Sequence, residues 1–157
     1  MARPVSYGQV SGSNFASPFL NSANLSFVAR SGKFVALSAS YIGLAGAASV
    51  TDIVGWALSG ETSYSATAGK DEISVITDRN AVFEMPISNT MTRTELQARV
   101  GLTCDLYLTG GKQYASPTSS TYDQLQIVGY KYYGSGDGEQ SVLVKLRPCT
   151  PTQTGVV

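Results

Sequence analysis

The chain has no histidine and few charged side chains. Without histidine, a Ser-His-Asp or Cys-His catalytic site cannot form, and the commonest metal ligand is missing. Charged residues make up 14% of the sequence, against an average of about 25%. The 11 basic and 11 acidic residues cancel, which removes the long-range field that attracts nucleic acids and anionic membranes. We therefore expect no enzyme, no cofactor or metal, and no nucleic-acid or membrane partner.

Cysteines and long apolar runs are also scarce. Two cysteines, Cys104 and Cys149, are too few for a disulfide scaffold, and the sequence leaves open whether they bond or stay reduced. The longest apolar stretch, residues 41–58, contains Asp52 and three glycines, so we interpret it as two short strands joined by a turn at 51–52. The N-terminus has no apolar segment typical of a secretory signal. We expect a soluble protein.

Most of the chain has the pattern of β-strands. Hairpins are predicted for residues 25–38, turning at 31–32, and for residues 73–85, turning at 78–80. Residues 102–108 are expected to form a strand before a turn at 109–112, and two longer strands are expected at 124–133 and 139–147. No internal sequence repeat is visible. The expected fold is all-β, a small antiparallel β-barrel or sandwich.

One short helix is predicted at about 92–100. Thr92 and Glu95 have the spacing of a capping box, in which hydroxyl and carboxylate accept the free amides of a helix start. Gly101 is suited to end the helix in a left-handed conformation. Glu95 is thereby assigned to a cap, and Glu84 is expected to point outward from a strand.

Residues 1–24 are rich in Gly, Ser, Asn and Pro and lack periodicity, so we expect an extended N-terminal arm. Its aromatic residues Tyr7, Phe15 and Phe19 are the candidate partner-binding residues, because anchors of this kind can lie across a neighbouring subunit. The alternative is that the phenylalanines fold back onto their own chain. The expected organisation is an arm at 1–24, a β domain at 25–150 and a tail at 151–157.

Two remaining sets of residues could carry a catalytic or ligand-binding function. Asp123 and Asp137 are the first acids to check for a glycosidase-like carboxylate pair, although acids at turns are usually solvated. Trp56 and the strand of residues 130–133, with three tyrosines, could form a carbohydrate-binding face if the rings are exposed, whereas cross-strand packing would bury them.

Three segments resemble the small head decoration, or capsid cement, proteins of tailed bacteriophages. They are VITDRNAVFEMPI (75–87), GLTCDLYL (101–108) and QLQIVGY (124–130), within a similarity that covers residues 33–148. The resemblance implies a structural virion protein that binds the outer surface of the phage capsid and bridges neighbouring major capsid protein subunits. It also implies a homo-oligomer, a dimer or trimer, synthesised and assembled in the bacterial host cytoplasm. The alternatives are another β-rich virion component, such as a tail or fibre domain, or a small carbohydrate-binding module.

Overall fold

A computed structural model describes residues 7–13, 15–46, 53–58, 63–134 and 139–147. Strands make up 51% of the structure, which has two antiparallel sheets and one short helix and is therefore all-β as predicted. The sheets are not closed into a barrel, so the sandwich is the predicted alternative that agrees with the structure. The expected tail at 151–157 lies outside the described residues.

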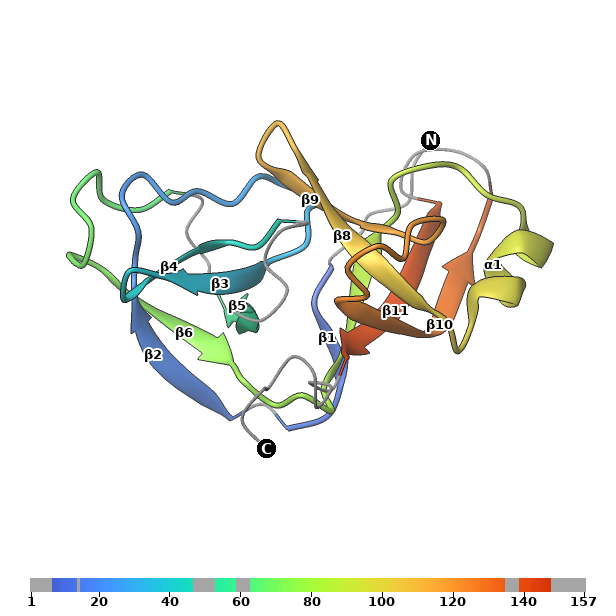
Figure 1. Cartoon of the computed structure of the whole chain (residues 1–157), viewed down its shortest axis with the longest axis horizontal. Helices are drawn as coiled ribbons and strands as arrows, with labels where there is room; N and C mark the ends of the chain where they lie inside the picture. Colours follow the sequence, from blue (N-terminus) through green and yellow to red (C-terminus); the bar gives the residue numbers. More distant parts are fainter. Residues whose placement is uncertain (1–6, 14, 47–52, 59–62, 135–138, 148–157) are drawn as a thin grey trace.

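The elements follow one another along the chain as coloured in Figure 1. They are β1 (Gln9–Ser11), β2 (Ala16–Leu20), β3 (Phe34–Ser38), β4 (Tyr41–Leu44), β5 (Ile53–Leu58), β6 (Glu72–Ile76), β7 (Val82–Pro86), α1 (Arg93–Arg99), β8 (Thr103–Thr109), β9 (Lys112–Ser116), β10 (Leu125–Tyr132) and β11 (Gln140–Leu146).

The two sheets lie beside each other along the long axis of the molecule. A six-stranded sheet has the order β1-β7-β11-β10-β8-β9 and lies to the right in Figure 1, with α1 at its outer end. A five-stranded sheet has the order β2-β6-β5-β3-β4 and lies to the left. We call β2 to β6 the first half of the protein and β7 to β11 the second half.

Both halves have the same topology. Counted within each half, strand one pairs with strand five, five with four, four with two, and two with three. In each half the residue after the first strand also makes an isolated parallel bridge to the third strand, Asn21 to Ile42 and Ile87 to Ala115. The next residue is a serine in both halves, and its backbone N–H donates to the same third strand at 2.9 Å. The structure thus repeats an arrangement that the sequence does not reveal, and of the described elements β1 and α1 stand outside it.

The predicted hairpin at 73–85 is wrong, because β6 and β7 belong to different sheets. The turn expected at 78–80 is there, since the Asp78 carboxylate accepts the backbone N–H of Asn80 at 2.9 Å. Its second oxygen accepts the N–H of Ser13 at 2.9 Å, from the segment that joins β1 to β2. The two chain crossings between the sheets therefore run side by side and are hydrogen-bonded to each other.

The predicted hairpin at 25–38 is also wrong. Residues 25–33 form no strand, and Leu25 and Phe27 are buried beneath the first-half sheet instead. The hairpin is formed by β3 and β4, whose connecting residues Ala39 and Ser40 both have positive φ. Alternation of apolar residues cannot distinguish a strand from a loop that buries every second side chain.

The local predictions in the second half are confirmed. The Thr92 hydroxyl accepts the N–H of Glu95 at 3.2 Å, and the Glu95 carboxylate accepts the N–H of Thr92 at 2.7 Å, so the capping box is complete. Gly101 follows the helix with a φ of +91°. β8 and the paired strands β10 and β11 also lie where the sequence placed them, while β9, the strand after the turn at 109–112, was not predicted.

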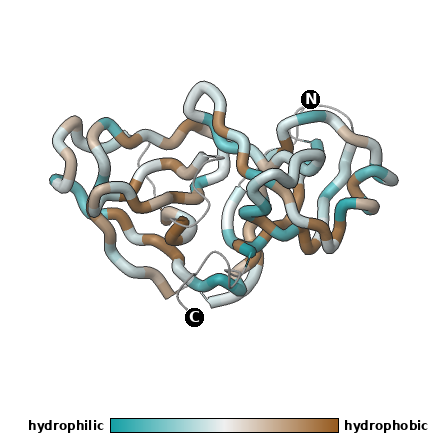
Figure 2. Tube along the Cα trace, viewed as in Figure 1, coloured by the Kyte–Doolittle hydropathy of each residue, from teal (hydrophilic) through white to brown (hydrophobic). Residues whose placement is uncertain are grey.

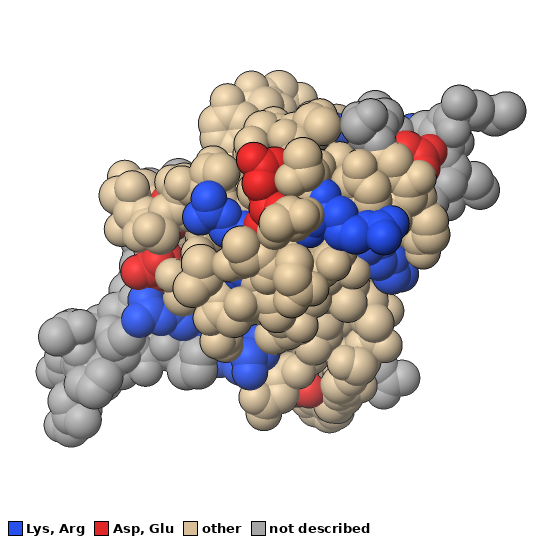
Figure 3. Space-filling model, turned by 90° about the vertical axis from the view of Figure 1, so that its right-hand side faces the viewer, with Lys and Arg blue, Asp and Glu red and all other residues tan. Residues whose placement is uncertain are grey.

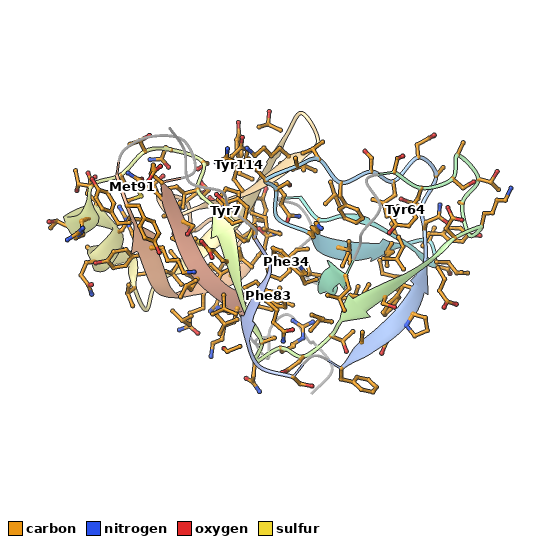
Figure 4. The ribbon with its side chains drawn as sticks, turned by 180° about the vertical axis from the view of Figure 1, so that it is seen from behind. Tyr7, Phe34, Tyr64, Phe83, Met91 and Tyr114 are labelled. Carbon is orange, nitrogen blue, oxygen red and sulfur yellow. The ribbon has the colours of Figure 1, made fainter. Side chains whose placement is uncertain are left out.

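A shared aromatic cluster joins the halves. Trp56 of β5 stacks on Phe83 of β7 with ring centroids 4.7 Å apart, and Phe34 of β3 meets both rings edge-on. Figure 4 shows Phe34 and Phe83 facing each other between the sheets, and the tube in Figure 2 is coloured as hydrophobic in several strands on either side of this junction. These rings belong to a core that spans both halves, and a second, smaller buried cluster lies within the first half.

Buried glutamines of the second half bind the backbone of the first. The side-chain N–H groups of Gln113 donate to the carbonyls of Phe34 and Ala45, both at 2.9 Å, and its oxygen accepts the N–H of Phe34. Gln124 donates to the carbonyl of Gly46 at 2.7 Å. These bonds satisfy backbone groups that would otherwise be buried without partners, and they fix the orientation of the two sheets.

Candidate interaction surface

The N-terminal segment is extended, but residues 9–20 are not separate from the body of the protein. β1 pairs with β7 at the edge of one sheet, and β2 pairs with β6 at the edge of the other. The described part of the expected arm is thus extended and pairs with the sheet edges of its own chain. The backbone N–H and C=O groups of these residues find partners within their own chain, which holds the segment against the body of the protein.

The three candidate partner-binding residues are placed differently. Phe15 is 70% exposed, just before β2, and its backbone N–H donates to the Ser13 hydroxyl. Phe19 packs against the buried apolar cluster of the first half, and Tyr7 is half-buried. The alternative of folding back onto the chain thus holds for Phe19, and Phe15 alone of the three presents its ring to solvent.

Further apolar side chains are exposed on one face of the first-half sheet. Pro18 of β2 and Leu58 of β5 lie on either side of Ser74 in register, and Leu20 follows Pro18 on the same face. All three are exposed. Sequence reasoning singled out Phe15 but missed these residues, because their common face depends on the strand order and not on their spacing.

The N-terminal strands add no charge to this part of the surface, where the exposed Glu72 of β6 is the register partner of Leu20. No charged residue occurs between Arg3 and Arg30, so the described residues 7–29 contribute only polar and apolar side chains. By contrast, Figure 3 shows Lys, Arg, Asp and Glu interspersed over the end of the molecule that carries α1. A segment without charged side chains but with exposed apolar residues is suited to a contact driven by shape and apolar burial.

The aromatic face required for the carbohydrate-binding alternative is not formed around Trp56. That ring is 2% exposed and lies in the core, while Tyr130 and Tyr132 are half-buried against it. The guanidinium of Arg93 lies 5.1 Å from the centre of the Tyr132 ring, so that tyrosine attaches α1 to β10. Only Tyr133 of this group is prominently exposed, at 60%.

A different pair of tyrosines reaches the surface on the β8–β9 hairpin. Tyr107 and Tyr114 are cross-strand partners with ring centroids 6.4 Å apart, and the ammonium of Lys112 lies 5.0 Å from the Tyr114 ring. Sequence reasoning did not single them out. The signal was present, because residues placed symmetrically about a Gly-Gly turn face each other across a hairpin.

The carboxylate of Asp105 has a structural role. The buried carboxylate of Asp105 accepts four hydrogen bonds, from the Ser119 hydroxyl and from the backbone N–H groups of Thr121, Tyr122 and Asp123. Burial would raise the pKa of Asp105, but these donors outweigh it and hold the pKa below its ordinary value. The carboxylate thus serves as the anchor of the loop between β9 and β10.

The other acids singled out from the sequence also have structural partners. Glu84 does not point into solvent as predicted: it is buried, 2.9 Å from the Lys131 ammonium and 2.6 Å from the Ser141 hydroxyl. Asp123 accepts the Thr103 hydroxyl and pairs with Arg147 at 3.2 Å. Asp137, its proposed catalytic partner, lies outside the described residues. Among the residues with described positions, no group of three or more acids and cysteines is arranged to hold a metal ion.

Cys104 has a free, fully buried thiol. Burial, reinforced by the charges of Asp105 and Asp123, raises the pKa of this thiol to about 12, which keeps it protonated and unreactive at neutral pH. Cys149, the possible bonding partner considered from the sequence, lies outside the described residues.

Within the described residues, no helix has the length and apolarity needed to cross a membrane.

The chain was compared with family models, curated proteins and solved structures. No family model matches the chain, and neither the curated proteins nor the solved structures contain a significant match to it.

Proposed function

We propose that this protein is a structural component of a phage particle that binds the outer surface of the capsid and bridges neighbouring major capsid protein subunits. The resemblance to head decoration proteins gives the class of partner. The observation that carries a binding role is the segment of residues 7–29 without charged side chains, with the Phe15 ring 70% exposed. An exposed aromatic ring on a segment without charged side chains can serve as the anchor of a contact with a partner.

The small number of exposed apolar side chains favours a partner present in many copies. Phe15, Leu20 and Leu58 are too few to cover the area of about 800 Å² that each partner buries in a stable two-body interface. Weak contacts become effective when several act together, because the first contact raises the effective concentration of the next. An assembled shell presents its subunits in such an array.

The proposal is tested by removing the exposed ring. Phe15→Ala is expected to weaken co-sedimentation with heads that lack the protein by about tenfold, while the free energy of unfolding stays within about 0.5 kcal/mol of the parent, because the ring packs against little. Tyr133→Ala is the matched control, since it removes another prominently exposed ring from the opposite half.

Two results would overturn the proposal: unchanged sedimentation of the Phe15→Ala protein with heads, or equal loss with Tyr133→Ala. Cross-linking in purified particles distinguishes a head protein from a tail or fibre protein. Cross-links to the major capsid protein support the proposed partner, and cross-links confined to tail or fibre proteins would favour the alternative virion role.

A further inference from the structure

The repeated topology allows the two halves to be compared position by position. β2 and β7 are the first strands of their halves, and each has its fifth strand on one side. On the other side, β7 is covered by β1, whereas β2 has no neighbouring strand there among the described residues and forms the sheet edge. The same edge is thus closed in one half and open in the other.

The sequence protects the open edge with a proline. Aligned on the bridge residues Asn21 and Ile87, Pro18 of β2 corresponds to Glu84 of β7. The backbone N–H of Glu84 points away from β11 and donates to the carbonyl of Gly8 at 2.8 Å. Proline has no N–H, so β2 lacks the donor that would hold an added strand at this position. β7 keeps that donor and depends on β1 for its protection.

β1 is held by little more than this edge. It has three residues, its register with β7 is interrupted by a bulge, and it lies outside the repeated topology. Val10 is 49% exposed and Ser11 is exposed, so β1 buries little apolar surface. Its backbone hydrogen bonds are therefore the main contribution to its attachment, and any strand of similar shape would make the same bonds.

We propose that the outer edge of β7 is a strand-docking site that takes β1 of its own chain in the monomer and β1 of a second copy in an oligomer. Exchange of identical strands keeps the backbone hydrogen bonds between β1 and β7 and changes the path of the connecting segment, across which the Gln9 side chain donates to the Ser13 carbonyl at 2.7 Å. The occupant is a second copy because its β1 already fits this edge in sequence and register. The proposal does not depend on a capsid partner.

The geometry of the connection limits the exchange to β1. Gly12 has a φ of +99°, a conformation open to glycine, and directly follows β1. The next residue is fixed by the hydrogen bond from the Ser13 N–H to Asp78, and β2 begins at Ala16. Rotation at Gly12 therefore frees β1 without detaching β2.

Cross-strand cysteines test the exchange in the purified full-length protein. Ser11 and Val82 are register partners, so Ser11→Cys/Val82→Cys, in a Cys149→Ser background, can form a disulfide between β1 and β7. Samples oxidised at increasing protein concentration are analysed on denaturing, non-reducing gels. Gln126→Cys/Lys145→Cys is the matched control, because it joins the two strands of the β10–β11 hairpin.

Strand exchange predicts a reducible dimer band whose share rises with protein concentration for the Ser11/Val82 pair, while the control pair gives only the internally linked monomer. The proposal is overturned if the Ser11/Val82 pair links only within one chain at every concentration. It is overturned equally if Ser11→Cys alone gives the same dimer, since the link would then not pass through β7.

Discussion

Asp105 is the residue on which the loop before β10 depends. Its carboxylate accepts hydrogen bonds from Ser119, Thr121, Tyr122 and Asp123, so the loop folds around a single negative charge. Hydrogen bonds to an ionised group are stronger than those between neutral groups, at about 1.5–3 kcal/mol each. The stability of this loop should therefore depend on pH.

The sign of that dependence follows from the lowered pKa of Asp105. Because the folded-state pKa lies below the ordinary value of 3.8, the contribution is complete above that value and is lost as the pH falls through it towards the folded-state pKa. We predict that Asp105→Asn lowers the free energy of unfolding by about 2 kcal/mol at pH 7, by urea denaturation, and that the difference from the parent shrinks as the pH is lowered from 5 to below 3. Glu72→Gln, at an exposed position of β6, is the control and should change little. A constant difference at all these pH values would contradict this account.

At the scale of elements, the two equivalent hairpin turns use different residues for one conformation. Both connecting residues have positive φ in each turn, Ala39 and Ser40 between β3 and β4, and Gly110 and Gly111 between β8 and β9. Glycine adopts this conformation without the steric cost that a side chain adds. The first turn is therefore strained where the second is not.

We predict that Ala39→Asn/Ser40→Gly stabilises the protein by about 1 kcal/mol, because Asn-Gly is the preferred pair for this two-residue turn. The melting temperature measures the gain. The reciprocal change Gly110→Ala/Gly111→Ser should lower the melting temperature. A higher melting temperature in both variants would show that the turn conformation does not limit stability.

The elements that could be predicted from sequence are those fixed by nearby residues. The capping box joins Thr92 to Glu95, and the Gly-Gly turn lies within a single hairpin. The errors concern partners far apart in the chain. The contact between Phe34 and Gln113 joins residues 79 positions apart. β6 was wrongly paired with β7 because strands adjacent in the sequence usually pair. The candidate surface shows the same division, since the sequence named Phe15 as either an exposed anchor or a ring folded back, and did not indicate the exposed sheet face of Pro18, Leu20 and Leu58.

At the scale of the whole molecule, the shared core makes the halves one cooperative unit. Trp56, the only tryptophan, stacks on Phe83 across the junction, so its fluorescence reports on contact between the halves. We predict that fluorescence and far-ultraviolet circular dichroism follow one urea transition, and that Gln113→Met shifts both to lower urea by the same amount. Gln97→Met, exposed on α1, is the control. Separation of the two curves would mean that one half unfolds while the other persists.

The position of β11 has a consequence for biosynthesis. In each half the last strand made inserts between two earlier ones, β6 between β2 and β5, and β11 between β7 and β10. Neither sheet can be completed as the chain emerges in order, because the first strand of each half lacks its neighbour within that half until the last strand is made. A nascent chain halted before residue 140 would therefore lack the strand that joins its second half together, and quality control by chaperones and proteases should recognise it as unfolded.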